Sequence, residues 1–451
     1  MRKFQVKGFA LGMVALFMLF LIPMAFTLIQ RTVRLNRTVW REQASGVGRR
    51  LASEVMVDYM SQFSKGSGYY EDHFSASSLA RTASIFSAGG STATVIPNPA
   101  ARTILIRAQG KARTTGQSTP EKNIEALIRF IPLVGQFAFE FPFNFTDNVP
   151  GDVYDGPVRV GMNFNVAGAN IIFNQPVLVG QNLNARMDTR FNSQVYHGGT
   201  LNPAYTPVVY TAGVPIPDVS PTKYFSIDPV YYANICTTSS LVTTWWEFRD
   251  NAGVGEFRST MDQNGDFNID GADGLPGPWT PVPVSGGVFF TWNVKTFVSG
   301  TVRGRVTIVS GCSGGAPNDG VRGAIEVVGA FGYPGAQLYA DPQSSIFLLA
   351  GRRFILDIVV NGPTTMAGAM YVENPIYNSP DCGGGGDASL KRRWGVGAVG
   401  GDQINIYGSW NNSGSCEAFN WRVFHDPSLT LYPAPGVPEY PALMSWRRYR
   451  N

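Results

Sequence analysis

The stretch that decides the fold is FALGMVALFMLFLIPMAFTLI, residues 9–29, an apolar run that contains no charged side chain. At a rise of about 1.5 Å per residue, a helix over this run is long enough to cross a hydrocarbon layer of about 30 Å. A cleaved secretory signal has a shorter apolar core with small residues after it, whereas this run leads into Gln30-Arg31. We therefore expect a transmembrane helix over 9–29, with a plain single-pass anchor as the alternative.

The helical pattern does not stop at the end of the apolar run. Between residues 30 and 65, apolar side chains recur at steps of three, four or seven, on the face made by Val33, Trp40, Ala44, Val47, Leu51, Val55, Tyr59 and Phe63. This spacing is typical of one face of an α-helix. We expect residues 30–65 to be an amphipathic continuation of the first helix.

The junction before the apolar run is Lys7-Gly8-Phe9-Ala10-Leu11. It resembles the leader junction of type IV pilins and pseudopilins. The resemblance implies that residues 1–8 are a prepilin-type leader, cleaved between Gly8 and Phe9. Most of those proteins have glutamate five residues into the mature chain, where this sequence has Met13. That departure resembles the minor pilins of the PilX and GspK kind.

Composition indicates a large β-rich part after the helix. Only 15% of the 451 residues are charged, while 51 are glycine, 30 are proline and 12% are aromatic. Such a composition favours strands and turns over disorder. Residues 1–65 hold ten basic and three acidic side chains, which leaves 26 basic and 29 acidic in the other 386 residues. This balance does not favour a nucleic-acid surface, although a local basic patch remains open.

A repeat points to stacked coils. PVRVGMNFN at residues 157–165 returns 19 residues later as PVLVGQNLN at residues 176–184. Short strands at a period near 20, separated by glycine and asparagine, are typical of a β-solenoid. Asparagine at the corners tolerates left-handed backbone and can form a ladder between coils. Two hairpins of an ordinary sandwich are the alternative.

The segment before the repeat, residues 66–150, is expected to be a small mixed α/β module. Residues 102–108 are predicted to form a strand and residues 121–130 a short amphipathic helix. Phenylalanine alternates from Phe137 to Phe145, which predicts a strand with an aromatic face packed on the long helix. Pro142 suggests an edge strand.

Further stretches resemble a bacterial family of PilX-like envelope proteins. They include Asp155-Gly-Pro-Val158, residues 298–309 (VSGTVRGRVTIV) and Phe424-His-Asp-Pro427. The resemblance implies a PilX-like minor type IV pilin with a β-solenoid-type ectodomain, serving competence, adhesion or assembly, and it implies no catalytic residues. We expect a mainly β chain with a Gly-rich repetitive β ectodomain over 151–430. A Pro-rich, basic tail is expected over 431–451, with Trp446 to Arg450 exposed to solvent.

One loop carries a metal-binding pattern. Residues 262–273 (DQNGDFNIDGAD) place oxygen ligands at loop positions 1, 3, 5, 7, 9 and 12, which are Asp262, Asn264, Asp266, Asn268 (through its carbonyl), Asp270 and Asp273. Hard oxygen donors at alternate positions suit Ca²⁺. The loop resembles dockerin-type and EF-hand loops, although Phe267 stands where glycine is usual and Asp273 where glutamate is. The alternative is an Asx-rich surface turn.

The four cysteines suggest disulfides in an exported protein. We favour Cys382–Cys416, which brackets a Gly-rich loop, and Cys236–Cys312 as the other pair. No Cys-x-x-Cys spacing is present, which speaks against zinc.

Enzyme signals are weak. Gly311-Cys-Ser313-Gly-Gly315 matches a nucleophile motif formally, but loop residues follow it where that motif requires a helix. We expect no enzymatic activity.

The predicted function is that of a minor type IV pilin-like structural or adhesive surface protein, incorporated in a pilus or at its tip. It would pass through the inner membrane and contact other pilin subunits through its first helix. Its surface ligand is open. The alternatives are a DNA-capturing competence pilin and a membrane-anchored carbohydrate-binding or carbohydrate-active envelope protein.

Overall fold

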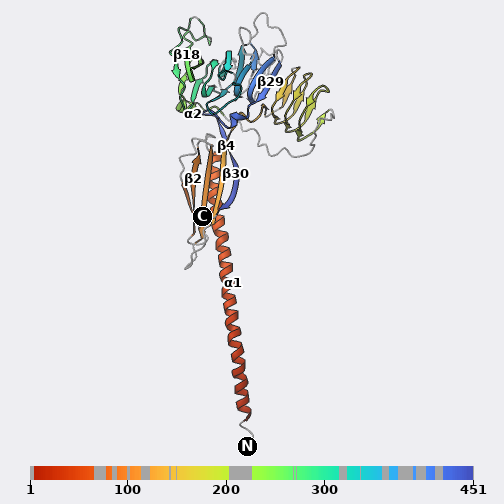
Figure 1. Cartoon of the computed structure of the whole chain (residues 1–451), viewed down its shortest axis with the longest axis vertical. Coiled ribbons are helices and arrows are strands. Elements are labelled where there is room, and N and C mark those ends of the chain that lie inside the picture. The colour runs from red at the N-terminus through yellow and green to blue at the C-terminus, as the bar shows by residue number, and fades with distance from the viewer. Residues whose placement is uncertain are drawn as a thin grey trace. The chain divides into compact units, whose positions relative to one another are not determined.

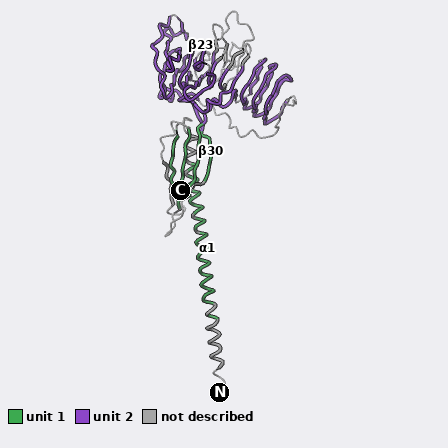
Figure 2. The backbone as a smooth tube through the Cα atoms, in the orientation of Figure 1, with its two compact units in different colours: residues 1–130, 441–451 green, residues 131–440 purple. Residues whose placement is uncertain are grey.

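The structure is a computed structural model that describes most of the chain. The described residues are 5–65, 78–83, 89–98, 102–112, 122–141, 144–148, 150–202, 226–267, 269–270, 272–313, 322–335, 337–357, 365–373, 390–392, 403–411 and 420–449. They are mainly strand, as the composition predicts. The chain divides into two compact units, unit 1 (residues 1–130 and 441–451) and unit 2 (residues 131–440), which Figure 2 colours separately.

One helix, α1 (Gln5–Lys65), runs through 61 residues without interruption. It confirms that the helix predicted over 9–29 continues through 30–65. Pro23 lies inside α1, and the helix continues past it in Figure 1. The Thr27 hydroxyl donates to the carbonyl oxygens of Pro23 and Met24, at 2.9 and 2.8 Å.

The side chains of residues 5–16, 19 and 20 lie outside the described part of α1. Over the residues that are described, we find no helix with the length and apolar character needed to cross a membrane.

The second half of α1 packs on a five-stranded sheet in the order β1-β2-β3-β4-β30. The strands are β1 (Ser78–Ala83), β2 (Gly89–Asn98), β3 (Thr103–Ala112), β4 (Lys122–Pro132) and β30 (Glu439–Tyr449). β1 to β4 are antiparallel. Ala52 and Met56 of α1 are fully buried in the core that this packing makes, together with isoleucines of β3 and β4. Residues 102–108 are therefore largely strand, as predicted.

The helix predicted over 121–130 is wrong, because its described residues, 122–130, lie in β4. Ile124, Ala126, Ile128 and Phe130 are buried, so the burial follows a period of two. The apolar residues of this segment fit a helical and a strand period equally well. β3 decides between them, because β4 pairs with it from Lys122 to Arg129.

The C-terminal residues Glu439–Tyr449 form strand β30 beside β4 at the edge of the sheet, an element that the sequence did not predict. The described side chains from Leu443 to Arg447 are exposed, as predicted for Trp446. The Arg447 guanidinium is 2.7 Å from Glu125 Oε1 on β4, and the Arg107 guanidinium on β3 is 3.0 Å from Glu125 Oε2. The hydrogen bond from Arg447, followed by that from Arg107, lowers the pKa of the Glu125 carboxyl. Glu125 therefore ties β30 to the centre of the sheet.

Unit 2 begins with a run of short parallel coils. The strands of this first run are β5 (Phe139–Phe141), β6 (Phe145–Asp147), β7 (Val153–Asp155), β8 (Val158–Val160), β9 (Phe164–Val166), β10 (Ile172–Phe173), β11 (Val177–Val179), β12 (Leu183–Ala185), β13 (Arg190–Phe191), β14 (Val195–His197) and β15 (Leu201–Asn202). Val158 pairs with Val177 and Phe145 with Phe164, each 19 residues on. This parallel register confirms the stacked coils predicted from the repeat and excludes paired hairpins.

The glycine of the repeat has a steric reason. A Cβ atom on Gly180 would lie 1.9 Å from the carbonyl oxygen of Gly161, the same position one coil earlier. Successive coils therefore approach too closely at this corner for any side chain. A Cβ atom on Gly198 would likewise lie 2.3 Å from the carbonyl oxygen of Gly180, so Gly180 and Gly198 are both needed for coil stacking.

The second run starts at the opposite end of the stack. Its elements are α2 (Pro229–Ile235), β16 (Thr238–Ser240), β17 (Thr244–Asn251), β18 (Val254–Met261), β19 (Thr280–Pro281), β20 (Gly287–Trp292), β21 (Thr296–Thr301), β22 (Gly304–Gly311), β23 (Ala324–Gly332), β24 (Ser344–Ala350), β25 (Arg353–Asp357), β26 (Thr365–Val372), β27 (Leu390–Arg392), β28 (Gln403–Asn411), β29 (Asn420–His425) and the 3₁₀ helix η3 (Pro427–Thr430). Strands β20, β22, β24, β26 and β28 pair in parallel, one after another.

The two runs join into one stack although they are distant in sequence. β28 pairs in parallel with β5, and β29 pairs in parallel with β7, so the first coil of the chain lies in the middle of the stack. Figure 1 shows the blue strands of the C-terminal region beside the yellow coils of the first run. Arg422 of β29 donates to Asp155 of β7 at 2.6 Å across this seam.

The alternating phenylalanines do not pack on the long helix, which is a second correction. Phe139 and Phe141 lie in β5 and Phe145 lies in β6, all within unit 2. Their rings meet inside the coil, with 4.7 Å between the ring centroids of Phe139 and Phe145.

Candidate functional site

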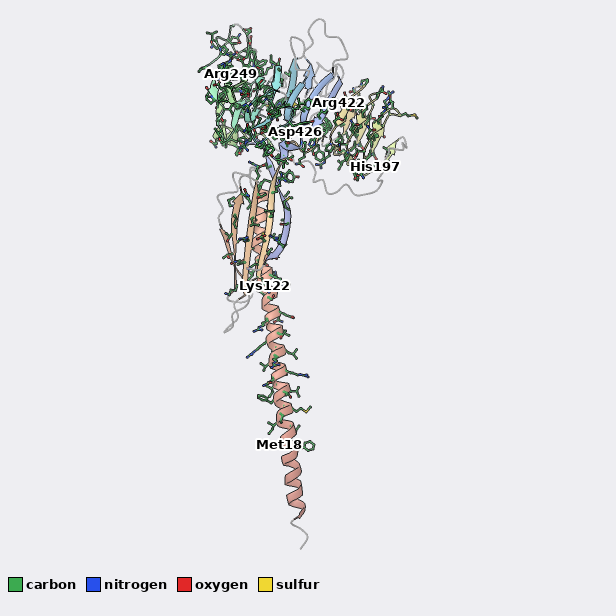
Figure 3. All side chains as sticks on the ribbon, viewed as in Figure 1. Met18, Lys122, His197, Arg249, Arg422 and Asp426 are labelled. Carbon is green, nitrogen blue, oxygen red and sulfur yellow. The ribbon has the colours of Figure 1, made fainter. Side chains whose placement is uncertain are left out.

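The described side chains in the first half of α1 have no described part of the chain packed on them. Every side chain from Leu21 to Val39 is exposed, and the described side chains stand away from the helix in Figure 3. We call residues 17–39 the bare segment. Eleven large apolar side chains of this segment are 43–66% exposed: Phe17, Met18, Leu21, Ile22, Met24, Phe26, Leu28, Ile29, Val33, Leu35 and Val39.

The exposure of the bare segment is energetically costly in water. Removing one such side chain from water stabilises a protein by roughly 1.5 kcal/mol at the low end. For eleven side chains this is on the order of 15 kcal/mol, which exceeds the net stability of many domains. The bare segment is therefore a surface for contact with lipid or with another protein.

Protein cover begins near Ser45. The buried residues follow one helix face: Ser45, Gly48, Leu51 with its neighbour Ala52, and Met56. Of the predicted apolar face, Leu51 is buried whereas Val33 is 43% exposed. Trp40, Ala44, Val55, Tyr59 and Phe63 have side chains outside the described part.

A glycine contact sets the distance between α1 and the sheet. A Cβ atom on Gly110 of β3 would lie 2.0 Å from the carbonyl oxygen of Gly48 and 2.8 Å from the backbone nitrogen of Ala52. Helix and strand backbones thus meet directly at this point. Sequence reasoning missed this contact, because a single glycine in a strand pattern does not identify its partner.

The predicted leader junction, Gly8-Phe9, lies in the helical backbone of α1. The side chains there are outside the described part, so cleavage at this position stays a prediction.

The predicted calcium loop follows strand β18 and is held by its own carboxylates. Asp262 is buried and accepts hydrogen bonds from the backbone nitrogens of Gly265 and Phe267, at 2.6 and 2.8 Å. Asp273 is buried and accepts from those of Asp270 and Gln263, at 2.6 and 2.9 Å. These two bonds, the one from Asp270 first, lower the pKa of the Asp273 carboxyl. The loop is thus closed at both ends.

Phe267 has a φ of 63°, in the left-handed region. It occupies loop position 6, where dockerin-type and EF-hand loops usually have a glycine because the turn is sharp. The backbone therefore makes that turn despite the aromatic side chain, whose ring lies 5.3 Å from the Arg322 guanidinium.

The described side chains of the loop do not converge on a point. Asp266 accepts from the Asn264 side chain at 3.1 Å, and Asp270 accepts from the Ala272 nitrogen at 2.8 Å. Among all described residues, no group of three or more His, Cys, Asp and Glu side chains is placed to hold a metal ion. Asn268 and Gly271 lie outside the described part.

The predicted Cys236–Cys312 disulfide is not formed. Cys236 ends α2 as a half-buried free thiol that donates to the carbonyl of Ala233 at 3.3 Å. Cys312 is buried at the end of β22, where it accepts from the Arg352 guanidinium at 3.1 Å. Cys382 and Cys416 fall outside the described residues, so their pairing stays a prediction.

Ladders of polar side chains hold the first run of coils together. The side-chain amide of Asn163 donates to Asn144 Oδ1, and that of Asn182 donates to Asn163 Oδ1, each at 2.8 Å. The amide and hydroxyl of Thr200 end this ladder on Asn182. The asparagine ladder expected at the coil corners is confirmed.

A buried ion pair follows the same period. Glu140 and Arg159 lie 19 residues apart, pair at 2.9 Å and are both buried.

Two titratable groups near the seam are perturbed by burial. Burial lowers the pKa of His425, whose Nε2 is 3.1 Å from the carbonyl oxygen of Gly135. Burial raises the pKa of Asp426, although the Ala340 nitrogen donates to its carboxylate at 2.6 Å. Asp426 also accepts from the Ser428 nitrogen at 2.9 Å and so caps η3.

Comparison with known proteins identifies no family for the chain. No protein-family model matches it, and no curated protein matches it. Among solved structures, the chain is similar to the crystal structure of the competence-associated pilin ComZ from Thermus thermophilus, at 11% identity and a TM-score of 0.32. The match covers 90% of this chain and 97% of that chain. A likeness at this TM-score carries no weight for fold or function, so the function is argued from the residues of this chain.

Proposed function

We propose that this chain is a membrane-anchored, filament-incorporated structural subunit, similar to the minor type IV pilins of the PilX kind. The bare segment of α1 carries the proposal. Its described apolar side chains belong to or follow the uncharged run of residues 9–29, and no described residue outside α1 covers them. Before assembly they would lie in the membrane, and after assembly against the helices of other subunits.

The remaining parts of the chain fit a subunit with a large surface head. Among the described side chains of α1, those buried by the sheet of unit 1 start at Ser45. Unit 2 is a stack of coils whose neighbours hold one another through parallel strands, polar ladders and buried rings. A head of 310 residues, 131–440, is too bulky for every position of a closely packed filament. We therefore propose a sparse or tip position, where the head is free to contact a surface.

Single glutamate substitutions test the role of the bare segment. Leu28 is 58% exposed in α1, and Val254 is 51% exposed in the hairpin of β17 and β18. Neither Leu28→Glu nor Val254→Glu should alter folding, since neither side chain is packed. We expect Leu28→Glu to remove the full-length protein from membrane and sheared-filament fractions of the cells, and Val254→Glu to leave it there. Equal recovery of both variants in those fractions would refute the proposal.

We also propose that the loop 262–273 binds Ca²⁺ as part of the head. The support is the spacing of its oxygen donors and the left-handed turn at Phe267, the position where such loops turn sharply. Binding would draw the Asp266 and Asp270 carboxylates inward beside Asp262 and Asp273. Bound calcium would hold the loop against β18 and supply no chemical step.

Calorimetric titration of the full-length protein with CaCl₂ tests this loop. We expect saturable binding that Asp270→Asn weakens. Asp188→Asn, at a half-buried carboxylate elsewhere in unit 2 that pairs with Arg186, should leave it unchanged. A unit 2 melting temperature that is the same in calcium and in chelator would count against a bound ion.

A further inference from the structure

Four arginines of the bare segment and its end form one row on α1. Arg31, Arg34, Arg37 and Arg41 follow one another at steps of three, three and four, so at about 100° per residue they fall within roughly a third of the helix circumference. All four are exposed. We call them the arginine row.

The arginine row has no counter-charge within the described part of the chain. None of its four guanidiniums makes an ion pair or a side-chain hydrogen bond with a described residue, and the first acidic residue of the sequence is Glu42. Arg50, about two and a half turns beyond Arg41 on α1, does have a partner, since it pairs with Glu54 at 2.9 Å. Like charges at three- and four-residue spacing repel, so the row favours an external anion.

The surroundings of the row decide the kind of anion. Leu28 and Ile29 precede it directly, and Val33, Leu35 and Val39 lie between its members, all exposed. The hydroxyls of Thr32 and Thr38 donate to the backbone carbonyls of Leu28 and Arg34, at 2.8 and 3.0 Å. This stretch therefore presents mainly guanidiniums and apolar side chains. Apolar side chains followed along one axis by guanidiniums complement the surface of an anionic phospholipid layer, where hydrocarbon is followed by phosphate groups.

We propose that Arg31, Arg34, Arg37 and Arg41 bind the phosphate groups of anionic phospholipids at the membrane surface. The row spans about 15 Å along the helix axis, and long arginine side chains can reach back toward the headgroups while their stems cover apolar surface. The guanidinium fork matches phosphate with paired hydrogen bonds. This inference rests on the proposed function, because the apolar segment before the row must lie in the membrane.

Two matched double variants test the row in full-length protein mixed with vesicles. Arg34→Gln with Arg37→Gln removes two charges from the row, and Arg49→Gln with Arg50→Gln removes two exposed charges from the sheet-covered half of the same helix. Binding is measured by flotation with phosphatidylcholine vesicles, with and without phosphatidylglycerol. Circular dichroism of each variant checks that α1 is intact.

We expect wild-type protein to prefer the phosphatidylglycerol vesicles and to lose that preference as salt rises. A juxtamembrane arginine contributes roughly fivefold to such binding, so the first variant should weaken it by roughly 25-fold and the second should not. Equal loss in both variants, or no preference for phosphatidylglycerol in wild type, would overturn the inference.

The outcomes separate this inference from the proposed function. If the protein binds neutral vesicles and shows no preference for phosphatidylglycerol, the lipid inference is wrong and the proposed membrane anchor is supported. Failure to bind either vesicle counts against both. If the Arg34/Arg37 variant keeps its phosphatidylglycerol preference but no longer co-purifies with the filament fraction, the row binds protein carboxylates, and the lipid inference is wrong.

Discussion

Replacing Gly110 with alanine should loosen the helix from the sheet in unit 1. The new Cβ atom would lie 2.0 Å from the Gly48 carbonyl oxygen, where about 3.4 Å is an ordinary contact. Both groups belong to the backbone, so no rotamer change relieves the clash. Helix and strand must separate by more than 1 Å locally, roughly the difference between the two distances.

The separation acts on the best-buried part of the unit 1 core. Ala52 and Met56, both 0% exposed, lie on the turns of α1 that follow Gly48. Overpacking of this kind typically costs about 1–3 kcal/mol. Loss of glycine from a strand returns about 0.5–1 kcal/mol through the unfolded chain. We expect a net destabilisation of about 1 kcal/mol, confined to unit 1.

Calorimetric melting of the full-length protein in detergent measures the effect. For a unit made of residues 1–130 and 441–451, a loss of about 1 kcal/mol lowers the melting temperature by roughly 4 °C. The unit 2 transition should not move. Gly46→Ala is the matched control, because nothing lies within 4 Å of its Cβ position and alanine favours a helix. A Gly110→Ala protein that melts like wild type would refute the direct backbone contact.

Two further predictions concern unit 2. Asn163→Ala removes three hydrogen bonds of the ladder, at 2.8, 2.8 and 3.2 Å, and should destabilise unit 2 by about 2 kcal/mol in urea unfolding. The control is Asn165→Ala, on the exposed side of the same coil, which should have little effect on stability. Equal losses of stability in the two variants would disprove the ladder. Burial lowers the pKa of His425 in the folded chain below its ordinary 6.5. In acid the unfolded chain therefore binds more protons at this residue than the folded chain does. The stability that neutral His425 allows is fully present above pH 6.5 and is lost as the pH falls through the lowered pKa. His425→Gln should flatten the melting temperature of unit 2 between neutral pH and that window, and an unchanged slope would show that another group titrates.

Periodic features of the sequence were predicted well. The long helix follows from an uncharged run that leads into an amphipathic pattern, and both lie in α1. The coil stack follows from the repeat at residues 157–165 and 176–184, since strands that must stack in register repeat their buried residues and corner glycines. In both cases the pattern is local in sequence: the helix is stabilised by its own backbone hydrogen bonds, and each coil packs on the next repeat of the same chain.

Features that depend on distant partners were not predicted. Residues 121–130 are a strand because β3 pairs with them, and residues 439–449 are a strand because β4 lies beside them. The docking of β28 on β5 joins segments separated by more than half of the chain, which no local pattern indicates. Cysteine spacing likewise did not reveal that Cys236 carries a free thiol.

The spacing of the arginine row can be read from the sequence, but the extent of the sheet cannot. Among the described side chains of α1, burial starts at Ser45, and the row and the described apolar residues before it are exposed. The boundary between covered and bare helix is therefore the structural fact that carries the functional account.

The central claim is that this chain is processed and assembled as a pilin-like subunit. Its most direct test is the mass of the amino-terminal peptide of the protein isolated from the cell surface. The account predicts a chain that begins at Phe9, with residues 1–8 removed. An intact amino terminus at Met1 in surface material would contradict it.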